Sequence, residues 1–192
     1  MYAYFVRHGQ ATWNQYARIQ GVSDPPLSPL GIRQATLTAI WAKTLHCSKI
    51  AASDLVRAFH TACIISAETD IPVVPTRLLR ERDLFEFEGI RIDELKEKCS
   101  TSSDMDTTLA WQEYPYIESD LSLASRVAKL LNLLKAETNP ILVTHAGVIN
   151  AYWRTYCHID RESPPHIPTG SVLACDIDLG KIELIYSPNI SS

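Results

Sequence analysis

The sequence predicts an α/β fold, specifically a three-layer α/β/α sandwich whose mostly parallel central sheet carries an antiparallel edge. Short apolar or β-branched segments alternate with segments of helical periodicity along most of the chain. Residues 2–6 and 140–144 are apolar almost throughout, which is typical of strands buried on both faces. Near the end, residues 171–177 and 181–186 alternate in polarity and are joined by a turn containing Gly180, which predicts a hairpin.

Ser28 and Pro29 predict the start of the first long helix, because serine is a favoured N-cap and proline suits the first helical position. The residues that follow recur at helical spacing and include a strong apolar stripe. The residues at that spacing are Leu30, Gln34, Leu37, Trp41 and Leu45. A short second strand is expected at residues 49–53.

Asp54 is expected to cap the next helix, whose first turn holds Arg57. This helix is expected to carry Leu55, Phe59, Cys63 and Ala67 at helical spacing. Residues 71–74 then predict a third strand, which Pro75 is expected to close because proline cannot donate a hydrogen bond to a neighbouring strand.

The middle of the chain is the least regular region. Residues 78–89 are dense in charged and aromatic side chains without a clear period, which indicates a functional loop. A short helix is expected near residues 92–98. Residues 100–108 are polar and of low complexity, which predicts an exposed, mobile excursion.

The second half returns to regular elements. A helix from about residue 122 to 137 is expected to bury Leu123, Val127, Leu130, Leu131 and Leu134. The strand at residues 140–144 follows, and residues 148–156 predict a further helix. We find no repeats and no linker, so residues 1–192 are expected to form a single domain.

Composition narrows the class of protein. A net charge of −4 gives no indication of a surface for nucleic acid or an anionic membrane. The sequence has no signal-peptide pattern at its start and no apolar run of the roughly 20 residues that span a bilayer. The five cysteines are scattered and include no C-x-x-C pair, which predicts reduced thiols in a cytoplasmic protein and neither a disulfide framework nor a zinc site.

Candidate functional residues follow the expected strands. Arg7-His8-Gly9 ends the first strand, His145-Ala146-Gly147 ends the strand at 140–144, and Arg57 lies just after another strand. Ligands bind at the carboxyl ends of strands in open α/β sheets, so these residues are expected to converge. Two arginines suit a phosphate or a carboxylate, and two histidines suit proton transfer, nucleophilic attack or metal binding.

Together these residues resemble the histidine phosphatase, or phosphoglycerate mutase-like, superfamily. The resemblance covers nearly the whole chain in four blocks that occur in the family's order. The blocks are Val6-Arg7-His8-Gly9 with Trp13-Asn14, Gln20-Gly21 and Pro26–Gly31; Ser53–Ala58 with Thr61-Ala62; Leu79-Arg80-Glu81 with Glu86–Gly89; and Val143–Ile149.

The resemblance implies a chemistry and a role for each residue. His8 would be the nucleophile, attacking as a neutral imidazole whose other ring nitrogen donates to a backbone carbonyl. Glu81 would protonate the leaving oxygen and then assist the attack of water. The phosphoryl oxygens would be bound by Arg7, Asn14, Gln20, Gly21, Arg57, His145 and Ala146. The resemblance implies that no metal ion is needed, because these donors take the place of magnesium, and we expect a phosphatase of this kind to use no cofactor.

Two positions depart from the family pattern. Phe85 stands where many relatives have glycine, which bears on the placement of Glu81 because a bulky residue forbids some backbone conformations. Ala146 replaces a common glycine, which is a mild change. Glu88 is outside the expected catalytic set and is interpreted either as a partner of the catalytic residues or as a surface charge.

The resemblance favours a metal-independent phosphomonoesterase acting through phosphohistidine on a small phosphorylated metabolite, with residues 90–118 as a substrate-covering insertion. The substrate types it suggests are a sugar phosphate, a phosphoglycerate or α-ribazole-5′-phosphate. A cofactor-dependent phosphoglycerate mutase is the alternative; the modest middle excursion and the short tail after Tyr186 make it the weaker one. A non-catalytic module that binds phosphorylated ligands is a second alternative. The oligomeric state stays open, with a homodimer as one option.

Overall fold

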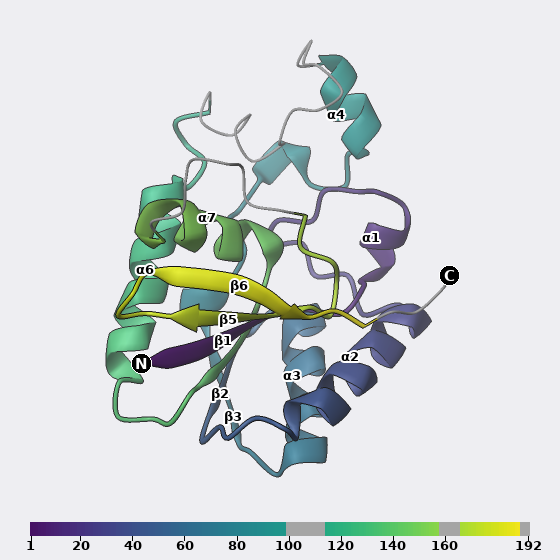
Figure 1. Ribbon diagram of the computed structural model, residues 1–192. Coiled ribbons are helices and arrows are strands. Elements are labelled where there is room, and N and C mark those ends of the chain that lie inside the picture. Colours follow the sequence, from purple (N-terminus) through teal and green to yellow (C-terminus); the bar gives the residue numbers. More distant parts are fainter. Residues whose placement is uncertain (99–113, 158–165, 189–192) are drawn as a thin grey trace.

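The computed structural model describes residues 1–98, 114–157 and 166–188 (Figure 1). Six strands form one sheet in the order β3-β2-β4-β1-β5-β6. Strands β3, β2, β4 and β1 are parallel, whereas β5 and β6 add an antiparallel edge beside β1. The strands are β1 (Tyr2–Arg7), β2 (Ile50–Ser53), β3 (Val73–Thr76), β4 (Ile141–Thr144), β5 (Val172–Asp176) and β6 (Lys181–Tyr186).

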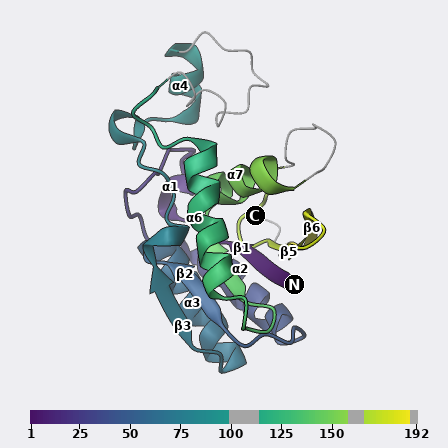
Figure 2. The ribbon, with the colours of Figure 1, turned by 90° about the vertical axis from the view of Figure 1, so that its left-hand side faces the viewer.

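Helices cover both faces of the sheet, which gives the expected three layers (Figures 1 and 2). Neighbouring strand residues point to opposite faces: Phe5 packs among side chains of α6 and α7, and Val6 among those of α2 and α3. The helices are α1 (Thr12–Gln15), α2 (Pro29–Ala42), α3 (Val56–Thr69), α4 (Ile92–Lys98), α6 (Asp120–Leu133) and α7 (Ala146–Tyr156), with the 3-10 turns η1 (Arg77–Leu79) and η2 (Phe85–Phe87). The predicted fold class is confirmed.

The stripe expected in the first long helix is only partly buried, because Trp41 packs against the core and Leu37 does not. In α2 the buried residues are small, including Ala35 and Ala39, whereas Leu37 is 37% exposed. In α3 the buried face includes Ala62 and Ile65, while Phe59 lies largely outside the core. Helix α2 packs on α3 and both pack on the sheet, and small side chains allow this close approach.

The expected cap of α3 was wrong. The N-cap position is Leu55, and no side chain of that residue caps the helix. The amide nitrogen of Val56 donates instead to Oδ1 of Asp24 at 2.7 Å. Asp54 is engaged elsewhere, because its carboxylate forms a bidentate ion pair with Arg80 at 2.5 and 2.8 Å. A distant loop thus supplies the negative charge at this helix N-terminus.

Other boundaries moved by a few residues. Helix α6 begins at Asp120 and ends at Leu133, with Ser119 as its N-cap. Strand β3 includes Pro75, which an edge strand tolerates because one side of it needs no hydrogen bond. The expected excursion at 100–108 and most of the expected insertion at 90–118 lie outside the described residues. Within the described part of the chain, no helix has the length and apolar character to cross a membrane.

Candidate active site

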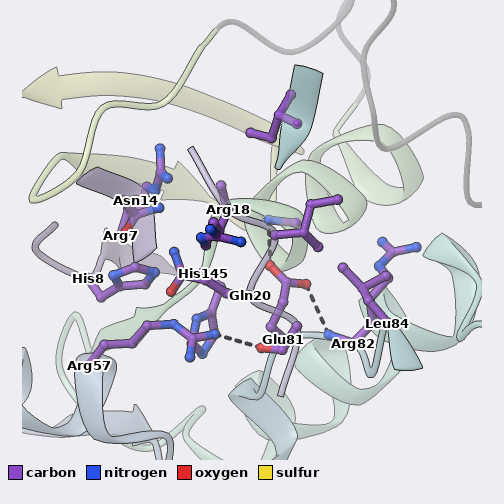
Figure 3. Close-up of a pocket in the computed structure, with 15 residues that line it drawn as sticks. Arg7, His8, Asn14, Arg18, Gln20, Arg57, Glu81, Arg82, Leu84 and His145 are labelled. Atoms are coloured by element: carbon purple, nitrogen blue, oxygen red, sulfur yellow. Dashed lines mark hydrogen bonds between the residues drawn. The ribbon is translucent and has the colours of Figure 1, made fainter. Parts of the chain in front are cut away.

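The carboxyl ends of β1 and β4 bring two histidines together. These strands are adjacent and parallel, with Arg7 opposite Thr144, so the residue that follows each strand lies at the same edge of the sheet. The amide nitrogen of His8 donates to the carbonyl oxygen of Thr144 at 3.0 Å. The ring centroids of His8 and His145 are 5.1 Å apart. Both rings line a pocket shown in Figure 3.

His8 is held in one orientation by its neighbour. Its Nδ1 atom lies 2.7 Å from the carbonyl oxygen of Gly9, which can only accept, so Nδ1 carries the proton and Nε2 keeps its lone pair. Burial, followed by the positive charges of Arg57 and Arg7, lowers the pKa of His8 well below its ordinary value. The imidazole is therefore neutral at neutral pH, and the expected hydrogen bond to a backbone carbonyl is present.

Two arginines place fixed positive charge beside the histidines. Arg57 is 1% exposed and donates from Nη1 to the carbonyl oxygen of Ser23 at 2.8 Å and from Nη2 to that of Gly21 at 2.7 Å. Arg7 donates from Nη1 to the carbonyl oxygen of Ile167. Burial lowers the pKa of Arg7 and of Arg57 to about 10, so both remain charged at neutral pH.

His145 completes the ring of donors. Its Nε2 atom lies 2.9 Å from the hydroxyl oxygen of Ser53, at the end of β2. Burial, followed by the charge of Arg57, lowers the pKa of His145 well below its ordinary value. A further positive charge beside Arg57 and Arg7 would be costly, so His145 is also neutral at neutral pH.

Several buried polar atoms of this pocket have no hydrogen-bonding partner among the described residues. Four of the five such side-chain atoms belong to pocket residues, and they are Arg7 Nε, Gln20 Oε1, Arg57 Nε and His145 Nδ1. Unpaired buried polar groups are rare in native proteins because each costs free energy. Three of these four atoms are nitrogens of residues that can donate, which suits an anion with several oxygens.

Glu81 reaches the same pocket from the segment after η1. Its Oε2 accepts from the amide nitrogen of Gly147 at 3.0 Å and its Oε1 from that of Arg82 at 3.0 Å (Figure 3). Arg82 is 3% exposed and forms an ion pair with Asp120 at 2.6 Å. Glu81 and Arg82 are therefore held by specific contacts within the fold.

Phe85 does not displace Glu81 from the pocket. Its φ is +49°, a left-handed conformation that glycine adopts freely and that other residues adopt at a cost. The phenylalanine thus takes the backbone conformation expected of the glycine found in relatives. The residue is 49% exposed, and its ring meets that of Tyr116 edge-on, with centroids 5.6 Å apart.

The remaining expected phosphate ligands also line the pocket: Asn14, Gln20, Gly21 and Ala146. The Oδ1 atom of Asn14 accepts from the amide nitrogen of Ala11 at 2.9 Å, which leaves the amide NH2 group for a ligand. Six lining residues were not among the predicted site residues, and they are Arg18, Ile19, Arg82, Leu84, Ile92 and Gly147. Of these, Ile92 lies within the expected substrate-covering segment 90–118. For Arg18 and Ile19 a signal existed, since they lie between the expected ligands Asn14 and Gln20.

The donor set suits an anion. Among residues 1–98, 114–157 and 166–188, no group of three or more histidine, cysteine, aspartate or glutamate side chains could hold a metal ion. Among the residues that the structure describes, the lining of the pocket combines charged guanidinium groups, neutral imidazoles and the carboxylate of Glu81. Such a site can bind a phosphoryl group, attack it with Nε2 of His8 and exchange a proton through Glu81.

Sequence comparison identifies the family. The sequence model of the histidine phosphatase superfamily (branch 1) matches residues 3–187. The chain belongs to this superfamily. A relative named probable phosphoglycerate mutase GpmB, from Proteus mirabilis, is 37% identical over 147 residues, which cover 74% of this chain and 68% of the relative. A protein of the same name from Yersinia pestis is 36% identical over 156 residues, covering 79% of this chain and 73% of the relative.

Solved structures place this histidine phosphatase superfamily member among phosphoglycerate mutase-like folds. A mycobacterial glucosyl-3-phosphoglycerate phosphatase superposes with a TM-score of 0.77 at 25% identity, covering 95% of this chain and 96% of that one. A phosphoglycerate mutase from Bacillus anthracis gives a TM-score of 0.77 at 19% identity, with 98% and 92% covered. At the latter identity the likeness concerns the fold alone.

Proposed function

We propose that the chain is a metal-independent phosphomonoesterase that acts on a small phosphorylated metabolite through a phosphohistidine intermediate. One observation carries the proposal. A buried, neutral His8 has its Nδ1 fixed by the carbonyl of Gly9, so Nε2 is free to act as the nucleophile beside Arg7, Arg57 and His145. Phosphoryl transfer depends mainly on such positioning and on electrostatic stabilisation of the phosphoryl oxygens.

In the first step Nε2 of His8 attacks phosphorus and the phosphorus–oxygen ester bond breaks. The guanidinium groups of Arg7 and Arg57 and the imidazole of His145 stabilise the charge on the phosphoryl oxygens. Glu81, in its protonated form, gives its proton to the departing oxygen and becomes a carboxylate. The products are an alcohol and phosphohistidine.

In the second step water attacks the phosphorus of phosphohistidine and the phosphorus–nitrogen bond breaks. The carboxylate of Glu81 takes a proton from the attacking water and returns to its acid form. Inorganic phosphate leaves and His8 is again a neutral imidazole. Glu81 thus serves as acid in the first step and as base in the second.

A cofactor-dependent phosphoglycerate mutase is the second candidate, and the names of the curated relatives favour it. Both functions would use the same histidine, and they differ in the fate of the intermediate. A mutase returns the phosphoryl group to a second hydroxyl, whereas a phosphatase delivers it to water. The phosphatase among the structural neighbours supports hydrolysis as a chemistry of this fold.

The decisive experiment is hydrolysis of an aryl phosphate in EDTA by wild type, His8→Ala and, as a matched control, His60→Ala, which changes an exposed histidine outside the pocket. We expect turnover by wild type and His60→Ala and none by His8→Ala. A substrate screen would then cover sugar phosphates, phosphoglycerates and α-ribazole-5′-phosphate.

Two further outcomes would contradict the proposal. Rapid exchange between 2- and 3-phosphoglycerate in the presence of 2,3-bisphosphoglycerate, with little release of phosphate, would identify a mutase. Phosphate binding without turnover or phosphohistidine formation, and with the affinity kept in His8→Ala, would identify a module that only binds phosphorylated ligands.

A further inference from the structure

Glu88 packs against Gly21, which lines the pocket, and its carboxylate accepts hydrogen bonds from residues 22–23 and from Leu84. Its Oε1 accepts from the amide nitrogens of Val22 at 2.8 Å and Leu84 at 3.1 Å. Its Oε2 accepts from the amide nitrogen of Ser23 at 2.7 Å and from the hydroxyl of the same serine. Four donors on one carboxylate form a specific connection rather than a loose surface contact.

The segment that Glu88 holds, loop 20–23, is the one that positions Arg57. The carbonyl of Gly21 and the amide N–H of Val22 belong to one peptide unit. That unit accepts from Nη2 of Arg57 at 2.7 Å on one side and donates to Glu88 on the other. Ser23 also contacts both side chains, with its carbonyl bonded to Nη1 of Arg57 and its amide nitrogen to Glu88, but these two groups belong to different peptide units. The hydrogen bonds on the two sides of the Gly21–Val22 peptide strengthen one another.

Close packing supports the same connection. A Cβ atom on Gly21 would lie 2.0 Å from Oε1 of Glu88, so the carboxylate occupies the space that a side chain at this position would need. The negative charge of Glu88 also favours the charged form of Arg57. Burial lowers the pKa of Arg57, and the negative charges of Glu81, Asp24 and Glu88 oppose that effect. Glu88 thus helps to keep the buried guanidinium charged.

Backbone contacts join the two segments on either side of Glu88. The amide nitrogen of Gly89 donates to the carbonyl of Ile19 at 2.8 Å, and that of Ile19 donates to the carbonyl of Ile90 at 2.9 Å. Residues 81–92, which begin with the proposed proton donor, are therefore attached to the loop that carries the phosphate ligands.

We propose that Glu88 is a positioning residue, which sets the geometry and charge of Arg57 through loop 20–23 and thereby sets the affinity of the pocket for a phosphoryl group. Its effect on catalysis rests on the proposed phosphatase function. Its effect on phosphate affinity does not, because any phosphoryl-binding function of this pocket would use Arg57.

The test compares Glu88→Gln with Glu86→Gln. Glutamine at 88 keeps the shape but presents an NH2 group to backbone N–H donors. Glu86 lies two residues away, is exposed, and accepts a hydrogen bond from the hydroxyl of Tyr116. The probes are inorganic phosphate and orthovanadate, with Kd measured by calorimetry or by inhibition. We expect Glu88→Gln to raise both Kd values about tenfold, as expected for the loss of one charge-assisted hydrogen bond, and Glu86→Gln to leave them unchanged.

A double-mutant cycle with Arg57→Lys separates positioning from a general loss of structure. If Glu88 acts through Arg57, the effect of Glu88→Gln on phosphate affinity is much smaller in the Arg57→Lys background. A milder variant, Ser23→Ala, removes only the hydroxyl contact and is expected to raise the Kd for phosphate by a smaller factor. It keeps the test decisive if Glu88→Gln does not fold.

Unchanged phosphate affinity in folded Glu88→Gln, or equal effects of that change with and without Arg57, would overturn the inference. A wild-type protein that binds phosphate in an Arg57-dependent way but hydrolyses no ester would instead count against the proposed phosphatase. The two failures are thus distinguishable, because one concerns the affinity difference between variants and the other the turnover of wild type.

Discussion

The carboxylate of Glu81 lies against the first turn of α7, where its Oε2 accepts a hydrogen bond from the amide nitrogen of Gly147 at 3.0 Å. Amides in the first turn of a helix have no partner within the helix, and a negative charge there is favourable. A Cβ atom on Gly147 would lie 2.5 and 2.7 Å from the two oxygens of Glu81. The proposed proton donor, Glu81, therefore contacts the helix that begins directly after His145, and the contact is made at Gly147.

Gly147→Ala should separate binding from proton transfer. The new methyl group meets the mobile end of the Glu81 side chain, so we expect the protein to fold and the carboxyl group to move. General acid catalysis contributes roughly 10²–10⁴ to a rate; a partial displacement should therefore lower kcat by about tenfold or more. Phosphate affinity should stay close to that of wild type.

Leaving-group dependence provides the measurement. An alkyl phosphate needs a proton on its departing oxygen, whereas 4-nitrophenyl phosphate needs it much less. The rate of phosphohistidine formation in Gly147→Ala should therefore fall more for the alkyl ester, as it should in the reference variant Glu81→Gln. Equal losses for both esters would show that Gly147→Ala acts in another way than by moving the acid.

The positive φ of Phe85 predicts an inverted preference between alanine and glycine. An L-residue pays about 1–2 kcal/mol in the left-handed region, and glycine does not. Phe85→Gly should therefore have a higher free energy of unfolding than Phe85→Ala by about 1 kcal/mol, since both variants lose the ring contact with Tyr116. Urea denaturation of both variants measures this difference.

The adjacent residue supplies the control. Glu86 is not among the residues with positive φ, so at that position alanine should be as stable as glycine or more stable. If Phe85→Gly were less stable than Phe85→Ala, residue 85 would not adopt the left-handed conformation in solution.

The convergence of the site was predictable because it depends on strand order in space more than on side-chain packing. His8 and His145 each follow a buried strand, and the ends of neighbouring parallel strands meet. The buried helix faces were not predictable in the same way. Hydrophobic periodicity selected large residues such as Leu37, but the close contact of α2 with α3 requires small ones such as Ala39.

Long-range polar contacts were also beyond the sequence pattern. The acceptor for the Val56 amide is Asp24, which is 32 positions away, while the adjacent Asp54 pairs with Arg80. Likewise, Glu88 bonds to Ser23 across 65 positions. In each case several carboxylates could have made the contact, and only the packing of loops far apart in the chain decides among them.

The two pocket histidines predict a loss of stability in mild acid. Burial lowers the folded-state pKa of both His8 and His145 below the ordinary value of 6.5. As the pH falls below 6.5, the unfolded chain binds a proton at each histidine and the folded chain does not. Stability must therefore decrease with falling pH, by up to about 1.4 kcal/mol per pH unit for each histidine, until the folded-state pKa is reached.

His145→Gln removes one of these two groups, so the slope of unfolding free energy between pH 6 and pH 5 should become shallower by up to about 1.4 kcal/mol per pH unit. Urea denaturation without phosphate measures the slope, and the double variant with His8→Gln should lower it again by a similar amount. Carboxylates that titrate in the same range affect all of the proteins alike and cancel in the comparison. Equal slopes in wild type and His145→Gln would mean that His145 has the same pKa in the folded protein as in the unfolded chain. That result would contradict the conclusion that His145 is neutral in the pocket.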